Sequence, residues 1–224
     1  MNIKSFFKRV VFGSEIVARV SSQINGEILI TEDLFGHREM VIGRVCQSGG
    51  LVRALWQELF KRELKNYTRR KLKVLVLGLG CGTVAELIRE KLSEAEITGV
   101  EIDSHVVDIG RKYFSLEKVS GLEIVVTDAF TFKNDYLYDL VLVDLYLGQE
   151  FPQQAETTDF LQKIKSMMAK DGLVVFNRLY FNRQHRENAD VFLGKVRQIY
   201  PFVKTQKAVT NLLILASFEA RNGV

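Results

Sequence analysis

Residues 74–83 read VLVLGLGCGT, an apolar run of four residues followed by closely spaced glycines. A continuous apolar run without polar alternation is typical of a strand that is buried on both faces of a parallel sheet. Glycines after such a strand let the backbone turn tightly and let a ligand approach the main chain, and the next helix offers free N–H groups. This stretch therefore predicts a strand, a ligand-binding turn and a helix, which together open an α/β sheet.

The chain after residue 83 alternates between strands and helices. Apolar runs predict further strands at residues 97–100, 122–126, 140–143, 173–176 and 212–217. Apolar residues at helical spacing predict helices at residues 84–92, 106–113, 160–168 and 189–199. Elements in this order indicate an α/β fold with a Rossmann-like, doubly wound, mostly parallel sheet.

The first 64 residues follow a different pattern. Alternating apolar and polar residues predict short strands at Glu15–Val20, Gly26–Thr31 and Met40–Val45. The pair Asn25-Gly26 is a hairpin signal between the first two strands, and helical spacing follows over residues 51–64. We therefore expect two domains, namely an antiparallel β unit with its connecting helix in residues 1–68 and a nucleoside-binding domain in residues 69–224.

Composition excludes several classes of protein. The 224 residues are 47% hydrophobic and 26% charged, which is typical of a folded globular chain. Two cysteines are too few for a disulfide framework or a multi-cysteine zinc site, and the three histidines show no ligand spacing, so no metal is expected. Residues 1–13 mix charged and apolar residues instead of forming a secretory signal, and no apolar run is long enough to span a membrane. These features predict a cytoplasmic protein that does not engage a membrane.

Positive charge is concentrated in the first third of the chain. Residues 1–73 carry 14 Lys/Arg against 7 Asp/Glu, whereas residues 74–224 carry 17 against 20. The basic stretch 53–73 is compatible with binding RNA phosphates, but a solvated face of the helix and linker is the interpretation that we favour. It lacks the interleaved aromatic residues that stack on single-stranded bases, so nucleic acid is not the partner that we expect.

Glu101 follows the second strand of the predicted sheet, 23 residues after Gly78. A carboxylate there can accept hydrogen bonds from both hydroxyls of a ribose. The glycines are spaced G-x-G-x-G and Thr83 follows them, so the dinucleotide pattern G-x-G-x-x-G is not met. Taken singly, the glycines also suit an ordinary tight turn and Glu101 a solvated strand end. Their order on successive strands favours a nucleoside site.

Four segments in this order resemble the successive motifs of class I S-adenosylmethionine-dependent methyltransferases. They are VLVLGLGCGT at 74–83, GVEID at 99–103, VVTDAF at 125–130 and YDLVLVDL at 138–145. The resemblance covers roughly residues 70–218 and implies a seven-stranded sheet that binds S-adenosylmethionine. It implies a cofactor site with Gly78, Gly80, Cys81 and Gly82 at the methionine and ribose end, Glu101 on the ribose hydroxyls, and Ile102, Asp128 and Ala129 at the adenine.

The layout of the whole chain is similar to the spermidine synthase branch of that superfamily. Residues 45–48 resemble the strand end whose glutamine, here Gln47, contacts the nucleoside, and the likeness also suggests a homodimer through the N-terminal β unit. The amine-binding positions of that branch depart from its pattern. The acid of its glycine loop is replaced by Cys81, and the second acid after its fourth strand by Leu147, so that only Asp144 remains. Its Tyr-His-Glu on the connecting helix reads Trp-Gln-Glu at residues 56–58.

These departures lead to three hypotheses. The first is an enzyme that uses S-adenosylmethionine to methylate a small-molecule acceptor, with Asp144 as its catalytic or substrate-orienting acid, because a neutral Cys81 suits the carboxylate-bearing methionine end. The second is an aminopropyltransferase that uses decarboxylated S-adenosylmethionine and a remodelled amine site. The third is a non-catalytic nucleoside-binding homologue. We expect residues 145–158 and 178–187 to line the acceptor side, where the arginines of the second segment hint at an anionic acceptor or lie in a solvated loop.

Overall fold

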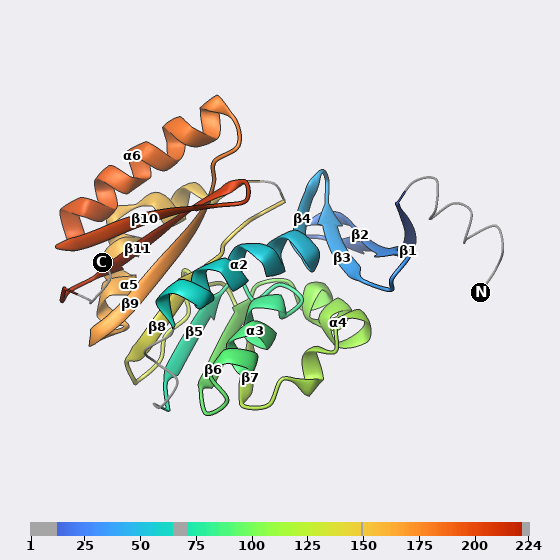
Figure 1. Ribbon diagram of the computed structural model, residues 1–224, viewed down its shortest axis with the longest axis horizontal. Helices are drawn as coiled ribbons and strands as arrows, with labels where there is room; N and C mark the ends of the chain where they lie inside the picture. Colours follow the sequence, from blue (N-terminus) through green and yellow to red (C-terminus); the bar gives the residue numbers. More distant parts are fainter. Residues whose placement is uncertain (1–12, 65–70, 149, 221–224) are drawn as a thin grey trace.

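The computed structural model describes residues 13–64, 71–148 and 150–220, and it contains two sheets (Figure 1). The small sheet has the order β1-β2-β3-β4. Its strands are β1 (Ser14–Ser22), β2 (Gly26–Asp33), β3 (Arg38–Ile42) and β4 (Val45–Ser48). The large sheet has the order β10-β11-β9-β8-β5-β6-β7. Its strands are β5 (Lys73–Leu77), β6 (Glu96–Glu101), β7 (Leu122–Val126), β8 (Tyr138–Val143), β9 (Met168–Leu179), β10 (Phe202–Ala208) and β11 (Asn211–Ser217).

The large sheet is mostly parallel and doubly wound. Strands β9, β8, β5, β6 and β7 are parallel neighbours, while β11 is antiparallel to both β9 and β10. The chain runs outward from β5 through β6 to β7, and then returns to the other side of β5 with β8. The order therefore reverses between β5 and β8, which is where open α/β sheets bind their ligands. The predicted fold class, including the N-terminal antiparallel unit, is confirmed.

Helices cover both faces of the large sheet. They are α2 (Gly50–Glu63), α3 (Thr83–Lys91), α4 (Ser104–Tyr113), α5 (Thr158–Ser166) and α6 (Arg183–Ile199), with short 3-10 turns at η1 (Leu116–Lys118) and η2 (Gln153–Glu156). Val74 and Val76 of β5 pack with α2 and α3, whereas Leu75 and Leu77 pack with α5 and α6. Successive side chains of a strand point to opposite faces of the sheet, and here each face is covered by helices, so the side chains on both faces must be apolar. This explains the unbroken apolar run of β5.

The structure corrects two of the predicted elements and adds a strand that was not predicted. The strand predicted through Met40–Val45 is interrupted by a turn at Gly43, whose φ is +60°, and β4 follows it. The helix predicted to reach residue 168 ends at Ser166, and Met168 begins β9 by pairing with Tyr138. Strand β10 was missed, because its sequence FVKTQKA has no continuous apolar run.

Helix α2 packs mainly against the large sheet and α3. Its buried side chains Leu55, Trp56, Leu59 and Phe60 belong to the same apolar cluster as Val74 of β5. The domain division at residue 68 stays a prediction. The prediction that residues 1–13 do not form a secretory signal concerns a segment of which residues 1–12 lie outside the described residues. Within the described ranges, no helix is long and apolar enough to cross a membrane.

The small sheet docks on α4 through an apolar face. Ile28, Ile30, Met40 and Ile42 of β2 and β3 meet Val106 and Ile109 of α4 together with Cys81, all of them buried. In Figure 1 the small sheet lies at one end of the molecule, beside α4 and the start of α2.

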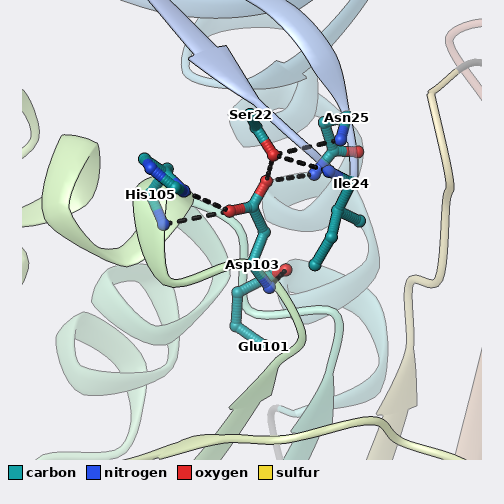
Figure 2. A network of polar contacts seen from close by, with 6 residues as sticks. All are labelled: Ser22, Ile24, Asn25, Glu101, Asp103 and His105. Atoms are coloured by element: carbon teal, nitrogen blue, oxygen red, sulfur yellow. Dashed lines mark hydrogen bonds and ion pairs between the residues drawn. The ribbon is translucent and has the colours of Figure 1, made fainter.

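A buried carboxylate reinforces this docking (Figure 2). Asp103 caps α4 by accepting a hydrogen bond from the N–H of His105 at 3.0 Å, and it also accepts from the Ser22 hydroxyl and, at 2.8 Å, from Asn25 Nδ2. Burial by itself raises the pKa of Asp103, but these hydrogen bonds from Ser22, Asn25 and His105 outweigh it and lower the pKa. One carboxylate thus holds the β1–β2 turn on the end of β6.

We expect Asp103→Ala to lower the free energy of unfolding by about 2–4 kcal/mol, because it removes a helix cap and leaves the Ser22 and Asn25 donors without their acceptor. Urea denaturation followed by circular dichroism measures this loss. Asp108→Ala, at an exposed position of the same helix, is the matched control and should change stability by less than about 0.5 kcal/mol. Equal losses in both variants would contradict a docking role for Asp103.

Candidate functional site

The glycine turn after β5 brings three strand ends together. Gly78 has a φ of +85° and its N–H donates to Val100 O of β6 at 3.0 Å. A Cβ at residue 78 would lie 2.2 Å from the carbonyl oxygen of Asp144, just beyond β8, so only glycine fits. Gly80 has a φ of +57°, and its N–H donates to Glu101 Oε2 at 2.9 Å. The turn therefore lies directly beside the two predicted acids.

A cavity of about 700 Å³ opens at this edge of the large sheet, where the small sheet adjoins it. Its volume falls within the range of small-molecule sites. Eight of the ten predicted site residues line it: Gln47, Gly78, Gly80, Glu101, Ile102, Asp128, Ala129 and Asp144. The sequence-based site is thus largely brought together in space.

Cys81 and Gly82 do not line this cavity. The Cys81 side chain is fully buried between the small sheet and α4, with its Sγ 3.3 Å from Met40 Sδ, and burial raises the pKa of its thiol far above the usual range. Its N–H donates to Ser48 Oγ at 3.0 Å. A Cβ at Gly82 would lie 2.2 Å from Leu116 Cδ1, so this glycine serves helix packing.

Glu101 is buried at the end of β6 but keeps room for a ligand. Its Oε2 accepts from Gly80 N–H and its Oε1 from Asp103 N–H at 3.1 Å. Burial raises the pKa of Glu101, and the two backbone donors oppose that rise. A carboxylate has about four lone-pair positions, so about two remain for ribose hydroxyls.

The turn after β7 is held in place by α5. Asp128 Oδ1 accepts from Phe130 N–H at 2.8 Å, which fixes the carboxylate. Lys163 of α5 donates through its Nζ to Ala129 O at 3.1 Å and to Phe130 O at 2.6 Å. Sequence reasoning missed Lys163, because nothing in its helical spacing shows that the ammonium reaches this turn. These contacts hold Asp128 and Ala129 in place at the cavity wall.

Asp144 follows β8 and belongs to a chain of hydrogen bonds. Trp56 Nε1 donates to its Oδ2 at 3.1 Å, and Asn177 Nδ2 donates to its Oδ1 at 2.7 Å. Asn211 Nδ2 in turn donates to Asn177 Oδ1 at 2.7 Å. Burial raises the pKa of Asp144 from 3.8 to about 6, and the hydrogen bonds from Asn177 and Trp56 limit that rise. The sequence offered no signal that Asn177 and Asn211 would join Asp144 in this chain of hydrogen bonds, because β9 and β11 become neighbours only in the sheet.

The segments predicted for the acceptor side line the cavity only in part. Leu145, Tyr146, Leu147, Pro152 and Gln154 line it from the first segment, and Leu179 and Phe181 from the second. None of the arginines of the second segment lines the cavity, so the hint of an anionic acceptor finds no support, and the side chain of Arg183 lies in solvent. Arg178 is buried beneath Phe151, 3.9 Å from its ring centroid, and pairs with Glu156. Within the described cavity wall the single cation is Arg44, at the β3–β4 turn.

The small sheet also contacts the loop that follows Asp144. Gln47 Nε2 donates to Gly148 O, and Gly148 N–H donates to Asn25 Oδ1 at 3.4 Å. Asn25 is the residue that also bonds to Asp103 in Figure 2. The β1–β2 turn therefore bridges the nucleoside end of the cavity and the acceptor loop.

Much of the basic stretch 53–73 is engaged in ion pairs. Arg53 pairs with Glu86 and Glu90 of α3, Arg62 with Glu58, and Lys71 with Glu96. Lys65, Arg69 and Arg70 lie outside the described residues. In the described part of the chain, no group of three or more His, Cys, Asp or Glu residues gathers in a way that could hold a metal ion.

Curated relatives include two kinds of transferase. The eEF1A lysine and N-terminal methyltransferase homolog of Drosophila melanogaster is 29% identical over 160 residues, which are 65% of this chain and 23% of that protein. The polyamine aminopropyltransferase of Vibrio vulnificus is 23% identical over 147 residues, which are 63% of this chain and 49% of that protein. The chain thus spans about a quarter and about half of the length of these relatives.

Solved structures share the fold. A probable spermidine synthase from Corynebacterium glutamicum superposes with a TM-score of 0.76 at 18% identity, over 93% of this chain and 82% of that one. Human methyltransferase-like protein 13 in complex with SAH gives a TM-score of 0.61 at 18% identity, over 75% and 80%. Residues 59–220 match the model of the Spermine/spermidine synthase domain family, and the chain belongs to that family.

Proposed function

We propose that this protein uses S-adenosylmethionine to methylate a small-molecule acceptor that is oriented by Asp144. The observation that carries the proposal is the acceptor side of the cavity, where Asp144 is the one carboxylate among the described lining residues. Holding a diamine calls for carboxylates at both of its ends, because a buried ammonium without a partner is costly. Leu147 stands where a second carboxylate is expected.

The residues of the cavity fit the cofactor by the chemistry of their donors and acceptors. Glu101 offers acceptors for the ribose hydroxyls, Asp128 an acceptor for the adenine amino group, and Ile102 an apolar surface for the ring. Arg44 offers a cation to a carboxylate, which S-adenosylmethionine has and its decarboxylated form lacks. When bound, the cofactor supplies an electrophilic methyl group on a sulfonium.

The role of Asp144 in this proposal is to hold the acceptor and to take up its proton. The carboxylate is fixed from two sides by Trp56 and Asn177, and the close contact of Asp144 with Gly78 places it beside the turn that would hold the cofactor. Fixing two reactants at the right distance and angle supplies much of the rate of a methyl transfer.

Aminopropyl transfer from decarboxylated S-adenosylmethionine is the second candidate. It is favoured by the family itself and by the retained Asp144, and relatives of both kinds match the chain. It requires a remodelled amine site, because position 147, at the cavity wall, is Leu.

Binding to the nucleoside site is tested by calorimetry with S-adenosylmethionine, its decarboxylated form and methylthioadenosine. We expect S-adenosylmethionine and methylthioadenosine to bind, and Glu101→Gln to weaken both by about 10- to 100-fold, because it loses charged acceptors for the ribose. Glu117→Gln, at an exposed position, is the matched control and should leave both affinities unchanged. If none of the three compounds binds, the proposed function is wrong. Preference for the decarboxylated form with turnover of putrescine would establish the second candidate instead.

The choice between the two cofactors is tested at Arg44. We expect Arg44→Gln to weaken the binding of S-adenosylmethionine by about tenfold, because one ionic hydrogen bond to the carboxylate of the cofactor is lost. Methylthioadenosine has no carboxylate, so its affinity in the same titration serves as the internal control. An equal loss for both compounds would show that Arg44 does not recognise the carboxylate.

The buried charge of Asp144 is tested through the pH dependence of stability. Folding raises its pKa from 3.8 to about 6, so the protonated form favours the folded state and that contribution is lost as pH rises through 6. Asp144→Asn removes this titration. Between pH 5 and pH 7.5 we expect the free energy of unfolding of the variant to gain about 1.4 kcal/mol relative to the wild type.

Urea denaturation at the two pH values measures the gain. Asp108→Asn, an exposed position on α4, is the control and should follow the wild type at both pH values. Parallel behaviour of Asp144→Asn and the wild type would show that Asp144 does not change its pKa on folding.

A further inference from the structure

The acceptor side of the cavity combines one carboxylate with an apolar entrance. Each oxygen of Asp144 accepts one hydrogen bond from the protein: Oδ2 accepts from Trp56, and Oδ1 accepts from Asn177. Because a carboxylate oxygen accepts about two hydrogen bonds, each keeps acceptor capacity for a ligand. Lys and Arg are absent from the described lining on this side, since Arg178 is buried with Glu156. The cavity floor therefore favours a cationic group.

The entrance is formed by large apolar side chains that remain open to solvent. Leu147 is 43% exposed, Phe181 51% and Val209 56%, and all three line the cavity. They come from three separate segments, namely the loop after β8, the link between β9 and α6, and the β10–β11 turn. Exposed apolar residues scattered singly are ordinary, whereas several that line one cavity favour that cavity as a binding surface, and Leu51 and Ile102 also line it with exposed side chains.

The strained backbone of Val209 also supports an apolar binding surface at the cavity. This residue has a φ of +54° in the two-residue turn between Ala208 and Asn211. A β-branched residue rarely adopts positive φ, and hairpin turns of this length favour glycine or asparagine. Backbone strain of this kind is concentrated at ligand-binding sites. The strain at Val209 therefore suggests that its apolar side chain contacts a ligand at the cavity, which glycine could not do.

We infer that the acceptor is a monoamine, with its single ammonium group against Asp144 and an apolar body between Leu147, Phe181 and Val209. This inference rests on the proposed function and names the substrate class. A diamine of similar length fits poorly, because its second ammonium would lie among these three apolar side chains. A carboxylic acid fits poorly because its charge would face Asp144.

The proposed reaction is balanced in atoms and charge. The bound ammonium gives one proton to the Asp144 carboxylate, which passes it to water, and the nitrogen lone pair is then free. A nitrogen–carbon bond forms to the methyl group as the carbon–sulfur bond breaks with its electron pair left on sulfur. The products are the N-methylated ammonium and a neutral thioether.

The test is a set of titrations into protein saturated with S-adenosylhomocysteine, using hexylamine, 1,6-diaminohexane and hexanoate. We expect hexylamine to bind at least about tenfold more tightly than the diamine, and hexanoate not to bind. Equal or tighter binding of the diamine, or of hexanoate, would overturn the inference. Saturation with the nucleoside is measured first. If that step fails, the proposed function is wrong, whereas its success without hexylamine binding overturns the monoamine alone.

Two matched variants locate the apolar body of the ligand. Leu147→Asp puts a second carboxylate at the entrance, and we expect it to shift the hexylamine-to-diamine affinity ratio by at least about tenfold toward the diamine. Val191→Asp, on α6 at a position that is 62% exposed and outside the cavity lining, makes the same exchange elsewhere. The ratio of Val191→Asp should equal that of the wild type. The same ratio in both variants would show that Leu147 does not meet the acceptor.

Discussion

The close contact between Gly78 and Asp144 is the constraint on which the site depends. The N–H of Asp144 donates to Leu77 O, at the end of β5, at 2.8 Å. The next residue, Gly78, has no space for a side chain, since a Cβ there would lie 2.2 Å from Asp144 O. The order of the sheet reverses between these two strands, so the contact falls at the ligand-binding edge. One backbone approach therefore fixes both the turn that would hold a cofactor and the acid that would face an acceptor.

The central strands were predictable because burial on both faces leaves a direct mark on the sequence. The run Leu122–Val126 has the predicted bounds, and β5, β6 and β8 differ from prediction by one or two residues. Strand β10 could not be found in this way, because it lies at the edge of the sheet and alternates polar residues with partly buried ones. The turn at Gly43 was missed for a related reason, since one glycine between two apolar runs is not distinctive until β3 and β4 pair.

Most of the predicted site residues line the cavity because they lie at or just after strand ends, and in a parallel sheet these ends share one edge. Glu101 and Asp144 are examples, each at the end of a strand that the sequence located. Their partners were not predictable. Asn177 reaches Asp144 from the interior of β9, and Lys163 reaches the turn after β7 from α5. Such contacts depend on side-chain direction, which a one-dimensional pattern does not specify. The prediction that Arg178 lines the acceptor side was wrong for the same reason, because its guanidinium turns inward to Phe151.

Side-chain direction also distinguishes the two positions, 81 and 147, at which the resemblance in the sequence leads us to expect an acid that this chain lacks. Cys81 is packed against Met40 where the small sheet docks, and a carboxylate there would be buried among apolar side chains at a cost of several kcal/mol. The packing of the small sheet alone is therefore sufficient to exclude an acid at position 81. Leu147 is 43% exposed and lines the cavity, and it belongs to none of the buried apolar clusters, so core packing does not exclude a carboxylate there. Because the stability of the fold does not require an apolar residue at position 147, the presence of Leu147 is better evidence about the acceptor than the presence of Cys81 is.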